Sequence, residues 1–211
     1  MSLDDALTHY REYFEDKLRR HGAAPQGVDY NGPEAQRIRF DQLIRILDPE
    51  QEFEVLDYGC GYGALLAYLK SRDWKFRYHG FDMLESMVRA AKEEHSTVPN
   101  ADFTWQEADL RPVEYVIAGA IFNNKFEASV DDWREYSLEV LDRLNALGTK
   151  GVAFNMLSSY SDADRMATRP DLYFGDPLFY FDYCKRNFSS DVSLLHDYGL
   201  YDFTILIRRS A

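Results

Sequence analysis

Three glycines stand at alternate positions between a short apolar run and a segment with helical spacing, in the sequence VLDYGCGYGALLAYL. Gly59, Gly61 and Gly63 let the backbone turn sharply and approach a ligand, and the helix that follows presents unpaired N–H groups. About twenty residues later Asp82 ends a second apolar run, where an acidic side chain can accept both ribose hydroxyls. The spacing therefore predicts a site for a cofactor that contains a ribose.

The glycine pattern alone leaves two classes of cofactor open. Gly59, Gly61 and Ala64 also satisfy the relaxed dinucleotide pattern G-x-G-x-x-G/A. Asp57 stands two positions before the first glycine, where its carboxylate would lie near the pyrophosphate of NAD(P). This carboxylate suits a ligand with ammonium and sulfonium groups better. The residues thus favour a sulfonium cofactor, and an NAD(P)-dependent oxidoreductase is the alternative.

The elements that must position these residues follow an α/β pattern. From residue 51 onward, short apolar runs alternate with helical patterns, which is typical of a parallel sheet with helices on both faces. The last two β-rich runs, VSLLHDYG and LYDFTILIRR, are too close for a parallel crossover of about a dozen residues, so we expect them to pair antiparallel.

Two helices are predicted before this core. Residues 4–20 have amphipathic helical spacing, and a second helix begins at Pro33, which occupies a first-turn position. We expect one domain over residues 1–211, with residues 1–50 as a helical cap and residues 51–211 as a Rossmann-like core.

The segment DYGCGYG resembles the first motif of class I S-adenosylmethionine-dependent methyltransferases, and the similarity extends over about residues 50–211. The resemblance implies a seven-stranded sheet in the order 3-2-1-4-5-7-6, with the seventh strand antiparallel, and S-adenosyl-L-methionine as the cofactor. The pieces VDYNGPEAQRIRF, GAIFNNK and FNMLSSYSD are also similar to a narrower bacterial group of uncharacterised members, which supplies no substrate.

The same resemblance assigns contacts to the methionine part of the cofactor. The turn from Tyr58 to Gly63 would hold this part, and the segment from Ala118 to Ile121 would face the sulfonium. Arg39, on the helix before the core with Gln36, would pair with the cofactor carboxylate. A solvated helix residue is the alternative for Arg39.

For the nucleoside part, the resemblance implies that Asp82 binds the ribose and Met83 lies against the adenine. Asp109 would accept a hydrogen bond from the adenine amino group, while the backbones of Ala108 and Leu110 frame the ring. Each role has a structural alternative, since Met83 could fill the core and Asp109 could cap a helix.

The acceptor site of an open α/β sheet lies beyond the carboxyl ends of its strands. The connection from Ser161 to Asp176 is long and rich in aromatic residues, so it is interpreted as a lid, with permanent packing of its aromatic residues as the alternative. The candidate substrate contacts near these strand ends are Tyr30, Asn123, Asn155, Tyr160 and Tyr173.

No catalytic residue is assigned. S-adenosylmethionine is already activated, so alignment can suffice, and a base is needed only for an acceptor that is protonated. His79 and His196 are interpreted as structural, and Cys60 as a small packing residue. The stretch AGAIFNN lacks the D/N-P-P-Y/F motif of enzymes that methylate base or amide nitrogens. A small-molecule acceptor is therefore preferred, with a protein side chain second. A protein that binds S-adenosylmethionine without catalysis is a further alternative function.

The charge and composition of the chain limit the kinds of partner that we expect it to bind. The net charge of −12 disfavours nucleic acids, and no apolar run approaches the roughly 18 residues of a membrane helix. The two cysteines have no partner at metal-ligand spacing and are too few for a disulfide framework, so we expect no metal and reduced thiols. The charged N-terminal segment favours a cytoplasmic protein, and the oligomeric state is left open.

Overall fold

The computed structural model describes residues 3–29 and 32–209. Within these residues one seven-stranded sheet has the order β3-β2-β1-β4-β5-β7-β6. Strand β7 runs antiparallel to both of its neighbours, and the other neighbouring strands pair in parallel. The predicted fold class and strand order are confirmed. The strands are β1 (Phe53–Tyr58), β2 (Phe76–Phe81), β3 (Ala101–Thr104), β4 (Val113–Ala118), β5 (Gly148–Leu157), β6 (Asp191–Leu195) and β7 (Asp202–Arg208).

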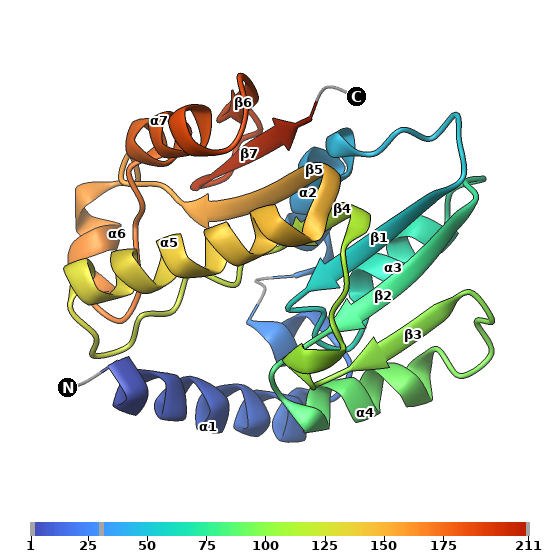
Figure 1. Cartoon of the computed structure of the whole chain (residues 1–211). Coiled ribbons are helices and arrows are strands. Elements are labelled where there is room, and N and C mark those ends of the chain that lie inside the picture. The colour runs from blue at the N-terminus through green and yellow to red at the C-terminus, as the bar shows by residue number, and fades with distance from the viewer. Residues whose placement is uncertain (1–2, 30–31, 210–211) are drawn as a thin grey trace.

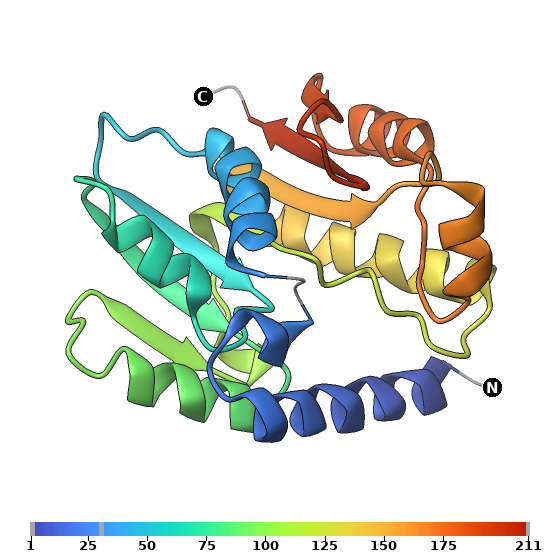
Figure 2. The ribbon, with the colours of Figure 1, turned by 180° about the vertical axis from the view of Figure 1, so that it is seen from behind.

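Helices cover both faces of the sheet (Figures 1 and 2). One hydrophobic cluster joins a sheet face to α5 and α7, and a second joins the other face to α2, α3 and α4. The helices are α1 (Leu3–His21), α2 (Pro33–Leu43), α3 (Ala64–Lys70), α4 (Glu85–Glu94), α5 (Val130–Leu147), α6 (Ala163–Thr168) and α7 (Pro177–Asn187). None of the helices in the described residues is both long and apolar enough to cross a lipid bilayer.

Alternate side chains of β4 belong to the two hydrophobic clusters on opposite faces of the sheet. Val116 and Ala118 pack in the cluster of α5 and α7, while Tyr115 and Ile117 pack in the opposite cluster. Successive side chains of a strand point to opposite faces, so a strand buried on both faces is apolar throughout. This burial fixes the register that brings the carboxyl ends of β1, β2 and β4 together.

Helix α1 lies along one end of the molecule, beside the start of α4 (Figure 1). Ala6 and Phe14 on its inner face are buried. The chain turns at Gly22, whose φ is +65°, and enters a short 3₁₀ helix at Pro25–Val28 before α2. The two N-terminal helices therefore border the ends of the strands that carry the predicted site.

The last part of the connection from Ser161 to Asp176 is packed against the rest of the molecule, whereas α6 within it has no buried residue. The N–H of Tyr173 donates to the carbonyl of Asn123 at 2.8 Å, and the N–H of Gly175 donates to that of Leu157 at 2.8 Å. Tyr173 is only 4% exposed, and its hydroxyl lies 2.8 Å from that of Tyr180. The substrate role given to Tyr173 is therefore corrected: this side chain belongs to the core, and the segment is an anchored cover.

Candidate active site

The glycine turn between β1 and α3 has a conformation that other residues cannot adopt without strain. Gly59, Gly61 and Gly63 have φ values of +84°, +53° and +82°. A Cβ on Gly59 would lie 2.3 Å from Cγ2 of Ile121, and one on Gly61 would lie 2.8 Å from Cγ1 of Val28. Glycine is thus required for both backbone angle and space. The turn also binds β2, because the N–H of Gly59 donates to the carbonyl of Phe81 at 2.7 Å.

Asp82 lies beside this turn at the end of β2. One carboxylate oxygen accepts from the N–H of Gly61 and the other from the N–H of Leu84, each at 2.9 Å. Each oxygen retains a lone pair for a further donor. Asp82 therefore holds the glycine turn in place and can still accept hydrogen bonds from a ligand.

Two pockets meet at Asp82. The loop pocket, of about 60 Å³, lies over the glycine turn and the end of β4. The aromatic pocket, of about 240 Å³, lies between α1, α5 and the end of β3. Four residues line both pockets: Tyr10, Gly59, Asp82 and Ile121. An elongated ligand that spans both pockets would place its middle at the Asp82 carboxylate.

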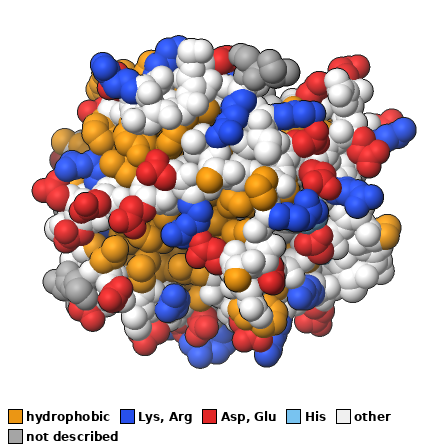
Figure 3. All heavy atoms as spheres, in the orientation of Figure 1, with side chains coloured by type: hydrophobic (Ala, Val, Ile, Leu, Met, Phe, Trp, Pro, Cys, Tyr) orange, Lys and Arg blue, Asp and Glu red, His pale blue; other side chains and the backbone are white. Residues whose placement is uncertain are grey.

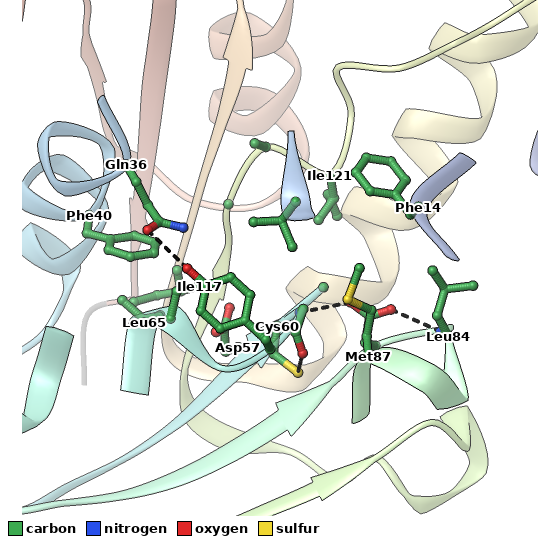
Figure 4. A pocket seen from close by; sticks show the side chains of 18 of the residues that line it. Phe14, Gln36, Phe40, Asp57, Cys60, Leu65, Leu84, Met87, Ile117 and Ile121 are labelled. Carbon is green, nitrogen blue, oxygen red and sulfur yellow. Dashed lines mark hydrogen bonds between the residues drawn. The ribbon is translucent and has the colours of Figure 1, made fainter. Parts of the chain in front are cut away.

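The loop pocket combines buried polar groups with apolar walls (Figure 4). Asp57 is 5% exposed and accepts a hydrogen bond of 2.5 Å from the hydroxyl of Tyr78. Gln36, on α2, is 7% exposed, and its amide nitrogen has no hydrogen-bond acceptor in the described part of the chain. Buried donors of this kind usually have a partner, so this nitrogen is suited to a ligand oxygen.

The two carboxylates of the site resist ionisation. Burial raises the pKa of Asp57 to about 7, the hydrogen bond from Tyr78 opposes this rise, and the charge of Asp82 adds to it. Burial likewise raises the pKa of Asp82 to about 6, against the hydrogen bonds from Leu84 and Gly61. A cationic ligand in this pocket would favour the ionised forms.

The wall of the aromatic pocket combines aromatic and aliphatic side chains with the charged side chains of Arg11, Glu107 and Arg143. Met83, Trp105, Tyr136 of α5 and Leu7 of α1 all line this pocket. Hydrophobic side chains gather between α5 and α1 on the surface shown in Figure 3, where this pocket lies. The predicted position of Met83 is therefore compatible with a stacked base. Trp105 was missed, although an aromatic residue directly after β3 was a usable signal.

Asp109 lines neither of the two pockets. Asp109 accepts a hydrogen bond of 2.7 Å from the hydroxyl of Thr104, and it lines, with Leu110, a hollow beside β2 and β3 that shares Trp105 with the aromatic pocket. Glu107 lines the aromatic pocket instead and pairs with Arg143 at 2.5 Å. The adenine role of Asp109 and the framing role of Ala108 and Leu110 stay predictions, since none of the three lines the aromatic pocket.

The structure gives Arg39 a different partner from the predicted cofactor carboxylate. Its guanidinium makes two hydrogen bonds to the carboxylate of Asp202 on β7, at 3.0 and 2.6 Å, and the Asp202 side chain is completely buried. Arg39 lines a third cavity rather than the loop pocket. The positive charge that we expected to meet a cofactor carboxylate is thus engaged with the protein, and Gln36 is the α2 residue in the loop pocket.

The remaining acceptor candidates separate into different environments. Asn155 is completely buried, and its amide oxygen accepts from the N–H of Ala120 at 2.8 Å, so it positions the β4 end rather than facing a ligand. Asn123 lines the third cavity. Tyr160 is 66% exposed at the surface, and Tyr30 lies outside the described residues. For Ala118, which is completely buried, the following residues Gly119 to Ile121 line the loop pocket instead.

His79, His196 and Cys60, the possible bases and nucleophile, contact other protein groups or are buried. The ring of His79 pairs with Asp102 at 2.7 Å on β3, and that of His196 lies near the ring of Tyr160. The Cys60 thiol is buried, which raises its pKa well above the ordinary value, and therefore it is not a thiolate nucleophile.

Comparison with known proteins supports one class of enzyme. Residues 55–148 match the family described as methyltransferase domain. The protein named "Putative methyltransferase Rv1506c" from Mycobacterium tuberculosis (strain ATCC 25618 / H37Rv) is 45% identical over 168 residues, covering 80% of this chain and 100% of the relative. The chain therefore belongs to the methyltransferase family.

Two solved structures share the fold over almost the whole chain. Magnesium protoporphyrin IX methyltransferase (ChlM) from Synechocystis PCC 6803 with bound SAM has a TM-score of 0.65 and 18% identity, and 99% of each chain is covered. The DhpI–SAM–HEP complex has a TM-score of 0.62 and 14% identity, and 98% of each chain is covered. At these identities the likeness shows the fold alone.

Proposed function

We propose that this enzyme transfers the methyl group of S-adenosylmethionine to a small molecule, with the cofactor lying across the loop pocket and the aromatic pocket. The observation that carries the proposal is the meeting of the two pockets at Asp82. The methionine part would lie over the glycine turn, near Gln36, and the ribose at Asp82, while Tyr58 lines the aromatic pocket. The adenine would lie between Met83 and Trp105.

The reaction is a displacement at carbon. The bond from the methyl carbon to the sulfonium sulfur breaks, its electron pair stays on sulfur, and a lone pair of the acceptor forms the new bond. S-adenosylhomocysteine leaves, and a protonated acceptor loses its proton to solvent or to a base. The protein contributes by aligning the two reactants and excluding water, and α1 supports this by placing Tyr10 and Phe14 over the loop pocket.

A small acceptor fits the space beside the cofactor better than a macromolecule. The third cavity, of about 100 Å³, adjoins the loop pocket at Phe14, Val28 and Ala120. The anchored segment from Ser161 to Asp176 contributes Arg165, Arg169 and Leu172 to its wall. A protein side chain on an extended surface would have to pass this cover.

The proposal is tested with trideuteromethyl S-adenosylmethionine. The enzyme is incubated with separate small-molecule, protein and nucleic-acid fractions of a cell extract, and products are analysed by mass spectrometry. We expect the label in the small-molecule fraction, and its loss with an Asp82→Ala variant. Label found only in protein or nucleic acid would contradict the choice of acceptor while leaving the methyl transfer intact.

S-adenosylhomocysteine should raise the melting temperature of the purified enzyme. A ligand that binds only the folded state at a hundredfold excess over its Kd adds about 2.7 kcal/mol, which corresponds to about 5–10 °C for a chain of this size. NADH at the same concentration should have no effect. Stabilisation by NADH without stabilisation by S-adenosylhomocysteine would favour an oxidoreductase.

Binding of S-adenosylmethionine should strengthen with pH. The pKa values of Asp57 and Asp82 are raised to about 7 and about 6, so their contribution to apo stability is greatest at low pH and is lost as pH rises through these values. The sulfonium cation favours the ionised carboxylates, which predominate at the higher pH. The rise in Tm caused by S-adenosylmethionine should therefore be larger at about pH 8 than at about pH 5.5.

Two comparisons isolate the cause of this pH dependence. S-adenosylhomocysteine lacks the sulfonium charge, so its stabilisation should vary less with pH. The Asp57→Asn variant removes one titrating group and should flatten the dependence for S-adenosylmethionine. Equal stabilisation by S-adenosylmethionine at both pH values would show that these carboxylates do not respond to the cofactor charge.

A further inference from the structure

The cavity beyond the loop pocket is lined by three arginines, Arg39, Arg165 and Arg169, in a chain whose net charge is −12. We call it the arginine cavity. It shares Phe14, Val28 and Ala120 with the loop pocket, so a ligand group inside it would lie next to the cofactor. Its volume of about 100 Å³ leaves room for a small group of a few heavy atoms.

Three carboxylates around the arginine cavity each have a basic partner. Asp171 receives two hydrogen bonds from the Nε of Arg169, at 3.0 and 3.2 Å, and one from its terminal nitrogen at 2.7 Å. The ion pairs and their N–O distances are Arg39–Asp202 at 2.6 Å, Arg169–Asp171 at 2.7 Å and Lys17–Asp29 at 2.8 Å. Arg165 is the arginine of this cavity outside these three pairs, and the nearby carboxylate of Asp162 accepts from the hydroxyl of Tyr201.

One hydrogen-bond donor of Arg165, its Nε–H group, has no acceptor in the described part of the chain. Its guanidinium carbon lies 4.6 Å from the centre of the Tyr201 ring, and the hydroxyl of Tyr201 donates to Asp162. Its Nε atom is buried and has no acceptor, and the guanidinium makes no ion pair with a carboxylate, within residues 3–29 and 32–209. A buried donor without a partner is costly, and an anionic acceptor would remove this cost.

We propose that the arginine cavity binds a carboxylate group of the methyl acceptor, with Arg165 as its main partner. This inference rests on the methyl transfer proposed above. The single positive charge of Arg165 matches a carboxylate, and the planar guanidinium suits its geometry. A phosphate dianion would leave unbalanced negative charge near Asp29, Asp171 and Asp202 in a small cavity. The bound carboxylate anchors the acceptor, whose reactive atom extends past Ala120 toward the cofactor.

The carboxylate of the cofactor itself is a less suitable occupant. The methionine part would lie over the glycine turn, where Gln36 lines the loop pocket and Arg165 does not; the amide nitrogen of Gln36 has no acceptor within residues 3–29 and 32–209. An experiment on protein saturated with S-adenosylhomocysteine separates the two possibilities, because the cofactor carboxylate is then already in place.

The test uses acetate as a carboxylate probe small enough for the cavity. NMR signals of the arginine Nε–H groups are followed while the S-adenosylhomocysteine complex is titrated with acetate, acetamide or inorganic phosphate. We expect acetate to shift the Arg165 signal saturably and the neutral acetamide to leave it unchanged. Phosphate should bind more weakly than acetate.

Two variants give the matched comparison. Arg165→Gln should weaken acetate binding, followed through the signals of Arg39 and Arg169, by at least about tenfold, the loss expected for a charge-assisted hydrogen bond. Arg186→Gln removes an arginine that is 74% exposed on α7 and should bind acetate like the original protein. The affinity of Arg165→Gln for S-adenosylhomocysteine should be unchanged.

Three results would overturn the proposal: equal binding of acetate and acetamide, undiminished acetate binding by Arg165→Gln, or tighter binding of phosphate than of acetate. Failure of S-adenosylhomocysteine to bind in the first step would instead contradict the proposed methyl transfer. The acetate titration of the unliganded protein would then still report on the arginine cavity.

Discussion

Replacement of Arg39 by alanine should lower the free energy of unfolding by about 3–5 kcal/mol, because it leaves the buried carboxylate of Asp202 without its partner. Asp202 is completely buried, and the Arg39 side chain is only 11% exposed. The pair joins α2 to β7 across 163 residues of sequence. Chemical denaturation of the two proteins measures the loss.

The matched control is Arg37→Ala on the same helix. Arg37 pairs with Asp41 at 2.6 Å, but its side chain is 57% exposed, so the loss should be about 0–1 kcal/mol. Equal losses for the two variants would show that the Arg39–Asp202 pair has no special role in stability.

The pH dependence of the Arg39→Ala variant identifies the cause of its loss. Burial raises the pKa of Asp202, and the charge of Arg39 opposes this rise, so removal of Arg39 should raise the pKa further. Protonation at low pH then neutralises the unpaired carboxylate. The destabilisation should therefore be smaller at about pH 5 than at about pH 8. A loss that does not vary with pH would point to packing instead of charge.

Replacement of Asp82 by alanine should weaken binding of S-adenosylhomocysteine by about 1.5–3 kcal/mol, about ten- to hundredfold in Kd, the range for hydrogen bonds to a charged group. The ribose would lose its acceptors, and the N–H groups of Gly61 and Leu84 would lose theirs. Calorimetric titration measures the change, and circular dichroism establishes that the variant is folded.

Asp109→Ala is the control for this measurement. Both aspartates were assigned to the cofactor by resemblance, but Asp109 does not line the aromatic pocket and accepts a hydrogen bond from Thr104 in the neighbouring hollow. Its replacement should leave the Kd unchanged within error. If Asp109→Ala weakens binding as much as Asp82→Ala does, the placement of the adenine in the aromatic pocket is wrong.

The features that could be predicted from the sequence depend on local chemistry. The α/β class follows from the periodic apolar runs, and the antiparallel pairing of the last two strands follows from their short connection. The strand order follows from the family resemblance, and it is confirmed in the structure. The glycine turn was recognisable because positive φ angles and close approach both demand glycine, as the contacts of Gly59 and Gly61 show. The juxtaposition of Asp82 with this turn follows from the parallel pairing of β1 and β2.

The features that could not be predicted depend on contacts between distant segments. Nothing near Arg39 in the sequence indicates that its partner is Asp202, and only the packing of α2 against β7 reveals it. Tyr173 was assigned to a lid from the composition of its loop. Its burial depends instead on contact with α7, where the hydroxyl of Tyr180 lies within hydrogen-bond distance of its own. Likewise, α1 could be predicted as a helix, but its contribution of Tyr10 and Phe14 to the loop pocket could not.

The position of the cofactor is tested most directly by a crystal structure of the enzyme with S-adenosylhomocysteine. We expect the ribose hydroxyls within about 3.2 Å of the Asp82 carboxylate, the distance of a hydrogen bond, and the adenine against Met83 and Trp105. The homocysteine part should lie over Gly59 to Gly63 with its carboxylate near Gln36. A ribose remote from Asp82, or an adenine in the hollow beside Asp109, would contradict the proposed site.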